Sequence, residues 1–210
     1  TLGGCALIAS NAEDPSDASS LTLVSSRMQG CRASVGGAVA IYGGHLTLLN
    51  GSEMADCHAQ QGGVLGDFGQ AEAGGVVLIS GEVVIRDSFV RNVHAHATTG
   101  LAAGGFMRMS GGKLTLVNTT VSNVTAISAG FSSHGGCLLI KEGRADLVNV
   151  TIEDAHAAGL TSATGGAIDL DGGVMSVTDS RIAAASATAT IGLLACAPNV
   201  FNTSFYMGDV

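Results

Sequence analysis

The chain has 210 residues, a net charge of −8 and an unusual composition, with 31 glycines against 2 prolines, no tryptophan and only 12 % charged residues. Its 9 basic residues are scattered singly, which excludes a patch that neutralises phosphates and argues against a nucleic-acid partner. Polar residues and glycine interrupt every apolar segment well before the roughly 18 to 20 residues of a membrane helix, so we do not expect a transmembrane protein.

Pairs of glycine recur along the chain, and each opens a short apolar segment. The pairs are Gly3-Gly4, Gly36-Gly37, Gly74-Gly75, Gly104-Gly105, Gly135-Gly136 and Gly165-Gly166. From Gly74 onward they follow one another every 30 or 31 residues, and a degenerate seventh copy begins near Gly192. Repetition at a fixed period of about 20 to 50 residues is typical of a solenoid, a propeller or an array.

Each copy divides into three short segments. The first reads "AVAI" in one copy and "CLLI" in another, and the second reads "LTLL" or "ADLV". A polar residue then follows, namely Ser25, Asn50, Asp87, Asn118, Asn149, Asp179 or Asn202. The third segment ends on an alanine in six copies, namely Ala33, Ala59, Ala95, Ala126, Ala157 and Ala187. The period-two alternation and the β-branched content predict strands rather than helices. Three strands per copy are too few for a propeller blade, which has four.

Three short strands per copy predict an all-β fold, a single-stranded right-handed parallel β-helix of about seven coils. Stacked coils lie about 4.8 Å apart, which lets asparagines hydrogen-bond in ladders and apolar columns interlock. The right hand follows from the preference of parallel crossover connections. We expect one domain over residues 1–210, forming a segment of a longer chain or assembly, with insertion loops near residues 10–20, 60–73 and 96–103.

Two details of the repeat point to a known class of proteins. The glycine-pair openings Gly36 to Val39 and Gly165 to Ile168, together with the single "FVRN" at Phe89 to Asn92, resemble the repeats of polymorphic outer-membrane proteins and adhesin-type β-helices. The corresponding positions in other copies read "TVSN" and "TIED". The resemblance implies a surface-exposed passenger, adhesion or coat protein rather than a particular reaction.

Five glycosylation sequons suggest an extracellular or cell-surface protein of the secretory pathway. Their acceptors are Asn50, Asn118, Asn123, Asn149 and Asn202. An asparagine exposed at a corner can carry a glycan without touching the core. The alternative is that asparagine serves the turn and threonine follows because strands favour it.

Cysteines give a second indication of the compartment. Cys31 and Cys57 occupy the same position in successive coils, within reach of a disulfide that would stabilise the fold by roughly 3 kcal/mol. The alternative is a pair of stacked, buried thiols. Cys5, Cys137 and Cys196 have no evident partner in the sequence.

A catalytic or metal site finds little support. The best candidates for a carbohydrate-active enzyme, a polysaccharide lyase or hydrolase, are Asp169, Asp171 and Arg108, but the repeat places Asp169 and Arg108 about 10 Å apart. His58, His94 and His156 share a column that is better read as solvent-facing than as a metal site. We therefore predict no catalytic residues, no metal and no cofactor.

In the first strand of each copy, the residues that point to one face and the residues that point to the other are both apolar. Both faces of this strand should therefore be covered. Either the insertion loops or a partner protein provides the cover, and we favour a partner on a stripe formed by Leu7, Ala40, Val76, Leu78, Phe106 and Leu139. Neither end of the chain resembles a cap. The predicted function is a structural or adhesive scaffold that binds proteins, glycans or further copies of itself through this lateral face and its ends.

Overall fold

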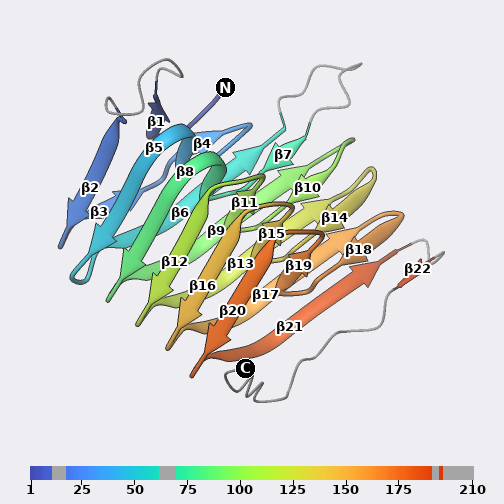
Figure 1. The fold of residues 1–210 in the computed structure, drawn as a ribbon. Coiled ribbons are helices and arrows are strands. Elements are labelled where there is room, and N and C mark those ends of the chain that lie inside the picture. Colours follow the sequence, from blue (N-terminus) through green and yellow to red (C-terminus); the bar gives the residue numbers. More distant parts are fainter. Residues whose placement is uncertain (11–17, 62–69, 191–193, 196–210) are drawn as a thin grey trace.

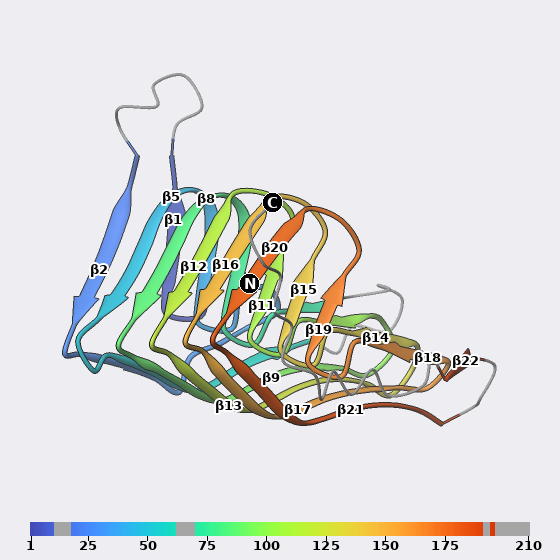
Figure 2. The same cartoon turned by 60° about the horizontal axis from the view of Figure 1, so that its bottom comes forward.

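The computed structural model describes residues 1–10, 18–61, 70–190 and 194–195 (Figure 1). This part of the chain contains strands and turns and no helix. The strands stack in parallel into a β-helix of about five turns, and Figure 2 shows the coils following one another along a single axis. The all-β parallel β-helix predicted from the sequence is confirmed.

Three parallel sheets form the walls of the coil. The ten-stranded sheet contains β1 (Ala6–Ala9), β2 (Ser20–Val24), β5 (Val39–Leu49), β8 (Val76–Arg86), β11 (Met107–Met109), β12 (Lys113–Val117), β15 (Leu138–Ile140), β16 (Arg144–Val148), β19 (Ile168–Leu170) and β20 (Val174–Thr178). The seven-stranded sheet contains β3 (Arg27–Gln29), β4 (Arg32–Ala33), β6 (Glu53–Gln60), β9 (Phe89–Ala97), β13 (Thr120–Ser128), β17 (Thr151–Gly159) and β21 (Arg181–Ala189). The five-stranded sheet contains β7 (Ala71–Glu72), β10 (Ala102–Ala103), β14 (Ser132–His134), β18 (Ser162–Thr164) and β22 (Leu194–Ala195).

The division of a coil into strands differs from the prediction. The first and second segments of each copy lie in one sheet, and in β5 and β8 they form one continuous strand. The third sheet comes from strands of two or three residues. Two of these, β7 and β10, lie in the segments 60–73 and 96–103 that we expected to be insertion loops. Of the third expected loop, near residues 10–20, residues 11–17 lie outside the described residues.

The number of turns is about five rather than seven. The first copy contributes no strand to the five-stranded sheet and is linked in this region by an isolated bridge between Leu2 and Val35. Most of the degenerate copy near Gly192 lies outside the described residues.

The main core lies between the ten-stranded and seven-stranded sheets and continues from coil to coil. Leu48, Ile85 and Leu116 form one of its columns and are fully buried. Phe106 is the largest buried side chain, and its ring occupies the space beside Gly75, where a Cβ atom would lie 2.8 Å from the ring. Large and small residues on neighbouring coils therefore complement one another in volume.

The register of one coil is shifted by one residue from the sequence alignment. Ala73, at a φ of +49°, and Gly74 form the corner that other copies build from two glycines. Gly75 therefore lies inside the coil. The shift aligns Val76, not Val77, with the inward residues of neighbouring coils. Because side chains alternate along a strand, this exchanges the faces of the two valines.

The alanine column forms a second, thin core. The seven-stranded sheet continues beyond the main core, and the five-stranded sheet turns back over its far end (Figure 2). The buried hydrophobic residues of this layer are alanines, namely Ala59, Ala71, Ala95, Ala97, Ala102 and Ala126, and the buried serines Ser128 and Ser133 take the positions of Ala97 and Ala102 one coil further along. Two sheets can approach this closely only where side chains are small, which explains why the repeat retains alanine here.

The predicted partner-facing stripe is wrong. Val76, Leu78 and Phe106 belong to the main core. Ala40 and Leu139 share an outward-facing column but are buried at the corner where the five-stranded sheet begins. Leu7, in the first coil, is the one member of the stripe that is exposed. The chain's own fold thus supplies the cover that we had assigned to a partner.

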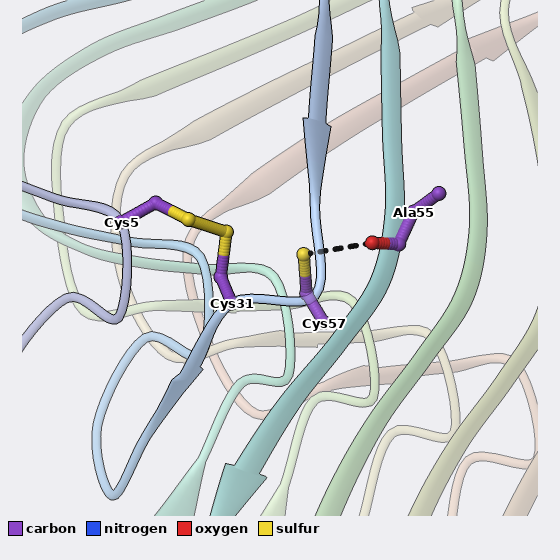
Figure 3. Close-up of a disulfide and its surroundings, with 4 residues drawn as sticks. All are labelled: Cys5, Cys31, Ala55 and Cys57. Atoms are coloured by element: carbon purple, nitrogen blue, oxygen red, sulfur yellow. Dashed lines mark hydrogen bonds between the residues drawn. A yellow bond between two sulfur atoms is a disulfide. The ribbon is translucent and has the colours of Figure 1, made fainter.

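The predicted disulfide is also wrong. Cys31 is bonded to Cys5, and Cys57 is a free, buried thiol (Figure 3). Cys5 precedes β1 and Cys31 lies between β3 and β4, so the bond spans the first coil from the ten-stranded to the seven-stranded sheet. Cys137 is a second buried thiol, and Cys196 lies outside the described residues.

Candidate functional site

The ten-stranded sheet presents one outward column at its corner with the five-stranded sheet. The column consists of Leu7, Ala40, Val77, Arg108, Leu139 and Asp169. The chain turns between the sheets through residues such as Gly104, whose φ is +62°. This turn brings the column against Glu72 and His134 of the five-stranded sheet. Two of the residues considered for an enzyme site, Arg108 and Asp169, lie in this corner.

Arg108 is neutralised by a residue that the sequence analysis did not consider. Its Nη1 forms an ion pair with Oε1 of Glu72 in β7, and both side chains are mostly buried. The Nε of Arg108 is buried without a hydrogen-bond partner in the described part of the chain. Removing Glu72 would leave an uncompensated buried charge, so we interpret the pair as part of the corner's structure.

Asp169 is held by two side chains of the five-stranded sheet. Its Oδ2 lies 3.1 Å from Nδ1 of His134 and accepts a short hydrogen bond from the hydroxyl of Thr164. The hydrogen bond with His134, followed by that with Thr164, lowers the pKa of Asp169 against the opposing effect of burial. Asp169 is therefore kept ionised, which suits an ion pair better than a proton donor.

The corner does not bring the three enzyme candidates together. Arg108 and Asp169 are separated by the coil that carries Leu139, and each has its own partner. Asp171 is exposed in the turn after β19. The geometry holds one ion pair, Arg108 with Glu72, and one separate hydrogen-bonded group around Asp169, and both join the two sheets.

Asparagine ladders run along the stack at two positions of the coil. In the predicted ladder, the Nδ2 of Asn118 donates to Oδ1 of Asp87 at 2.9 Å, and the Nδ2 of Asn149 donates to Oδ1 of Asn118 at 2.9 Å. All three residues have positive φ angles. The ladder predicted from the turn column is thereby confirmed.

A second ladder, which the sequence analysis missed, crosses the seven-stranded sheet. The Nδ2 of Asn92 donates to Oδ1 of Asp56 at 2.9 Å, and the Nδ2 of Asn123 donates to Oδ1 of Asn92 at 2.8 Å. Their positive φ angles mark a bend at the same place in each strand, and the pairing continues in register on either side of it. The signal was present in the sequence as an Asp or Asn five residues after the turn column, as in Asn118 and Asn123.

The sequons differ in how their asparagines are used. The side-chain amides of Asn118, Asn123 and Asn149 are engaged in ladders. Asn50 is exposed at its turn, and its side-chain amide forms no hydrogen bond within the described residues. The fifth acceptor, Asn202, lies outside them.

The histidine column lies on the outer face of the seven-stranded sheet. The rings of His58 and His94 are 5.2 Å apart, and Nδ1 of His94 lies 2.8 Å from the hydroxyl of Thr125. His156 instead contacts Ser186, with 2.7 Å between Nδ1 and Oγ. Burial lowers the pKa of His58 and of His94. The described part of the chain contains no group of three or more residues able to hold a metal ion.

The two terminal coils leave the main core only partly covered. Leu21 and Leu23 at one end, and Met175 and Val177 at the other, are partly buried, whereas their column neighbours in inner coils are fully buried. The sharpest contrast is between Leu170, which is 47 % exposed, and Ile140 one coil inward, which is 1 % exposed. The inward-facing residues of the terminal described coils are therefore less buried than those of the inner coils.

The comparisons found no match to a protein-family model, a curated protein or a solved structure. The likeness to polymorphic outer-membrane proteins thus rests on the glycine pairs and the single "FVRN" alone. Within the described residues, no helix is long and apolar enough to cross a membrane.

Proposed function

We propose that the protein is a non-enzymatic structural or adhesive β-helix of the extracellular space or cell surface, and that it binds through the ends of its coil stack. The observation that carries this proposal is the exposure of Leu170 beside its buried neighbour Ile140. A strand edge flanked by apolar side chains can accept another coil, from a second copy or from a partner protein. Because Leu170 is already about half buried, burying the rest of its side chain favours such a contact by about 1 kcal/mol.

The lateral face takes no part in this proposal, because the stripe we expected there is covered by the chain itself. The polar contacts of the corner also support a structural role. Arg108 and Asp169 each have a partner in the five-stranded sheet, so their charges stabilise the shape of the rod.

An extracellular location is supported by two features. The disulfide between Cys5 and Cys31 requires an oxidising compartment to persist. Asn50 is exposed in a sequon and can carry a glycan without breaking a ladder hydrogen bond. Both features fit the class implied by the resemblance to surface-exposed β-helices.

Self-assembly is the form of end-on binding that can be tested directly. We expect the chain to associate with rising concentration in sedimentation velocity experiments. Leu170→Lys places a charge on the end of the core and should raise the concentration needed for association at least tenfold. Val148→Lys is the matched control, because Val148 is also an exposed apolar residue but lies on an inner coil. A chain that stays monomeric, or two variants with equal effects, would contradict end-on self-assembly.

A further inference from the structure

Three cysteines lie next to one another in the first two coils (Figure 3). Cys5 and Cys31 form the disulfide, with 5.3 Å between their Cα atoms. The pairing of Arg32 with His58 places Cys57 beside Cys31, one coil further along the stack. The backbone N–H of His58 donates to the carbonyl of Cys31 at 2.9 Å, which fixes the two chains at the spacing of neighbouring strands.

Cys57 is a free thiol in the core, one coil away from the disulfide. Cys57 is fully buried, and its thiol donates to the carbonyl oxygen of Ala55 at 3.2 Å. In the view of Figure 3 the three sulfur atoms lie in a row, with that of Cys31 in the middle. Exchange requires the attacking thiol to reach a sulfur of the disulfide, and the strand pairing places Cys57 beside Cys31.

Chain entropy does not favour one pairing over the other. Cys5 and Cys31 are separated by 26 residues, and so are Cys31 and Cys57. Loops of equal length lose equal entropy when they are closed. Cys31 and Cys57 also lie at the strand spacing of about 4.8 Å, inside the range of Cα separations that a disulfide spans.

We propose that Cys57 is a resolving thiol that exchanges with the Cys5–Cys31 disulfide. The Cys57 thiolate attacks Sγ of Cys31, the Cys31–Cys57 bond forms, and the Cys5–Cys31 bond breaks. Cys5 leaves as a thiolate and takes up the proton that Cys57 released. One disulfide replaces another, so the step needs no external oxidant or reductant.

The product of this exchange is a free thiol at Cys5. Cys5 is exposed in the first coil, whereas Cys31 and Cys57 are buried. After exchange the buried pair retains a disulfide, and Cys5 is available for a mixed disulfide with an exposed disulfide of another protein. This site goes beyond the scaffold proposed above and does not depend on end-on association.

The exchange should be accelerated by alkaline pH. Burial raises the pKa of the Cys57 thiol, and the backbone N–H of Cys31 opposes this effect only in part. The thiolate is the attacking species, so its fraction and the exchange rate should rise about tenfold per pH unit while the pH stays below that pKa.

Alkylation of Cys5 tests the proposal. The oxidised chain is incubated with iodoacetamide at pH 7 and pH 8, and its disulfides are mapped by mass spectrometry without reduction. We expect alkylated Cys5 to appear together with a Cys31–Cys57 disulfide, and both to form about tenfold faster at pH 8. In Cys57→Ser the alkylation of Cys5 should be at least tenfold slower. Cys137→Ser should behave as the unmodified chain, because Cys137 lies in a distant coil.

A second variant keeps the proposal falsifiable if Cys57→Ser fails to fold, as judged by circular dichroism. In Cys5→Ser, the oxidising conditions that form the natural disulfide should yield the Cys31–Cys57 bond. The proposal is overturned if Cys31 and Cys57 both stay reduced in that variant. It is also overturned if Cys5 in folded Cys57→Ser is alkylated as fast as in the unmodified chain.

Discussion

The side-chain amide of Asn149 donates a hydrogen bond of 2.9 Å to the side-chain oxygen of Asn118, one coil away. The side-chain amide of Asn118 in turn donates a hydrogen bond to Asp87 on the preceding coil. All three residues have positive φ angles, a conformation in which asparagine and aspartate are far better tolerated than most residues. The same position therefore serves two purposes, which are to turn the chain and to align successive coils.

Replacing Asn118 should show both purposes. Asn118→Ala loses two ladder hydrogen bonds and places an alanine at positive φ, so we expect the free energy of unfolding to fall by about 2 to 3 kcal/mol. Asn118→Gly keeps the backbone conformation at low cost and should lose only about 1 kcal/mol, from the exposed ladder bonds. Urea denaturation of the two variants measures the difference, and equal losses would show that the backbone conformation is not a separate contribution.

The ladder also restricts glycosylation. A glycan on Nδ2 replaces one of the amide hydrogens, and the strand spacing of about 4.8 Å leaves little room for sugars on adjacent coils. Folded protein secreted from eukaryotic cells should carry a glycan on Asn50 and should not carry glycans on both Asn118 and Asn149. Site-resolved glycopeptide mass spectrometry measures the occupancy, with Asn50→Gln as the control. Folded molecules occupied at both ladder positions would contradict this expectation.

The second glycine of each corner pair is required by close backbone contact. A Cβ atom on Gly136 would overlap the carbonyl oxygen of Gly166 and would lie 2.6 Å from the carbonyl carbon of His156. Gly136→Ala should therefore destabilise the fold by about 3 kcal/mol or more. At Gly51 a Cβ atom would meet nothing within 4 Å, although φ is +77°. Gly51→Ala should therefore lower the free energy of unfolding by only about 1 kcal/mol. Thermal denaturation of the two variants provides the comparison. Similar losses of stability at both sites would show that the close backbone contact of Gly136 is not the cause.

The histidine pair should make stability depend on pH. Burial lowers the pKa of His58, with a further contribution from Arg32, and burial lowers that of His94, with a further contribution from His58. The unfolded chain, in which histidine has a pKa of about 6.5, therefore binds more protons than the folded chain in this range. The stabilisation is complete above pH 6.5 and is lost as the pH falls through the lowered values of the folded state.

We therefore expect the free energy of unfolding to decrease between pH 7.5 and pH 5.5. The double variant His58→Gln/His94→Gln should show a smaller decrease, because it lacks the two histidines whose pKa is lowered by folding. Denaturation curves recorded across this range provide the comparison. An identical decrease in the two proteins would assign the effect to other groups.

Columns along the stack could be predicted from the sequence, because each coil repeats the same residue at the same position. The alanine column from Ala33 to Ala187 and the ladder through Asn118 were found in this way, and the structure pairs both in register. Aligning copies says which residues are neighbours along the axis. It does not say which residues face one another across the coil.

This limit explains why the disulfide was predicted with the wrong partner. Cys31 and Cys57 are neighbours along the axis, as predicted, but the partner of Cys31 is Cys5 on the opposite wall of the same coil. Both loops span 26 residues, so loop length could not distinguish the pairings. Aligning the copies also does not reveal that the Cα atom of Cys5 lies 5.3 Å from that of Cys31 across the first coil.

The false stripe has two physical causes. Strands of two residues, such as β7 and β10, are too short to show an alternating pattern, so the sheet that covers the corner was read as loops. Ala73 adopts a positive φ at the corner where the other coils have glycine. The glycine pair Gly74-Gly75 was therefore aligned with the other pairs one residue too far along the chain. Because of this misalignment, Val76 was predicted to face outward, whereas it faces the core.

Cryo-electron microscopy of the protein isolated from the cells that produce it would test the central claim most directly. The account predicts rods joined end to end, or a rod embedded in an assembly, with a further strand hydrogen-bonded to the edge of β19 and with Leu170 buried by it. Single rods whose terminal coils carry no neighbouring strand, together with an oligosaccharide bound at the corner of Arg108 and Asp169, would contradict it.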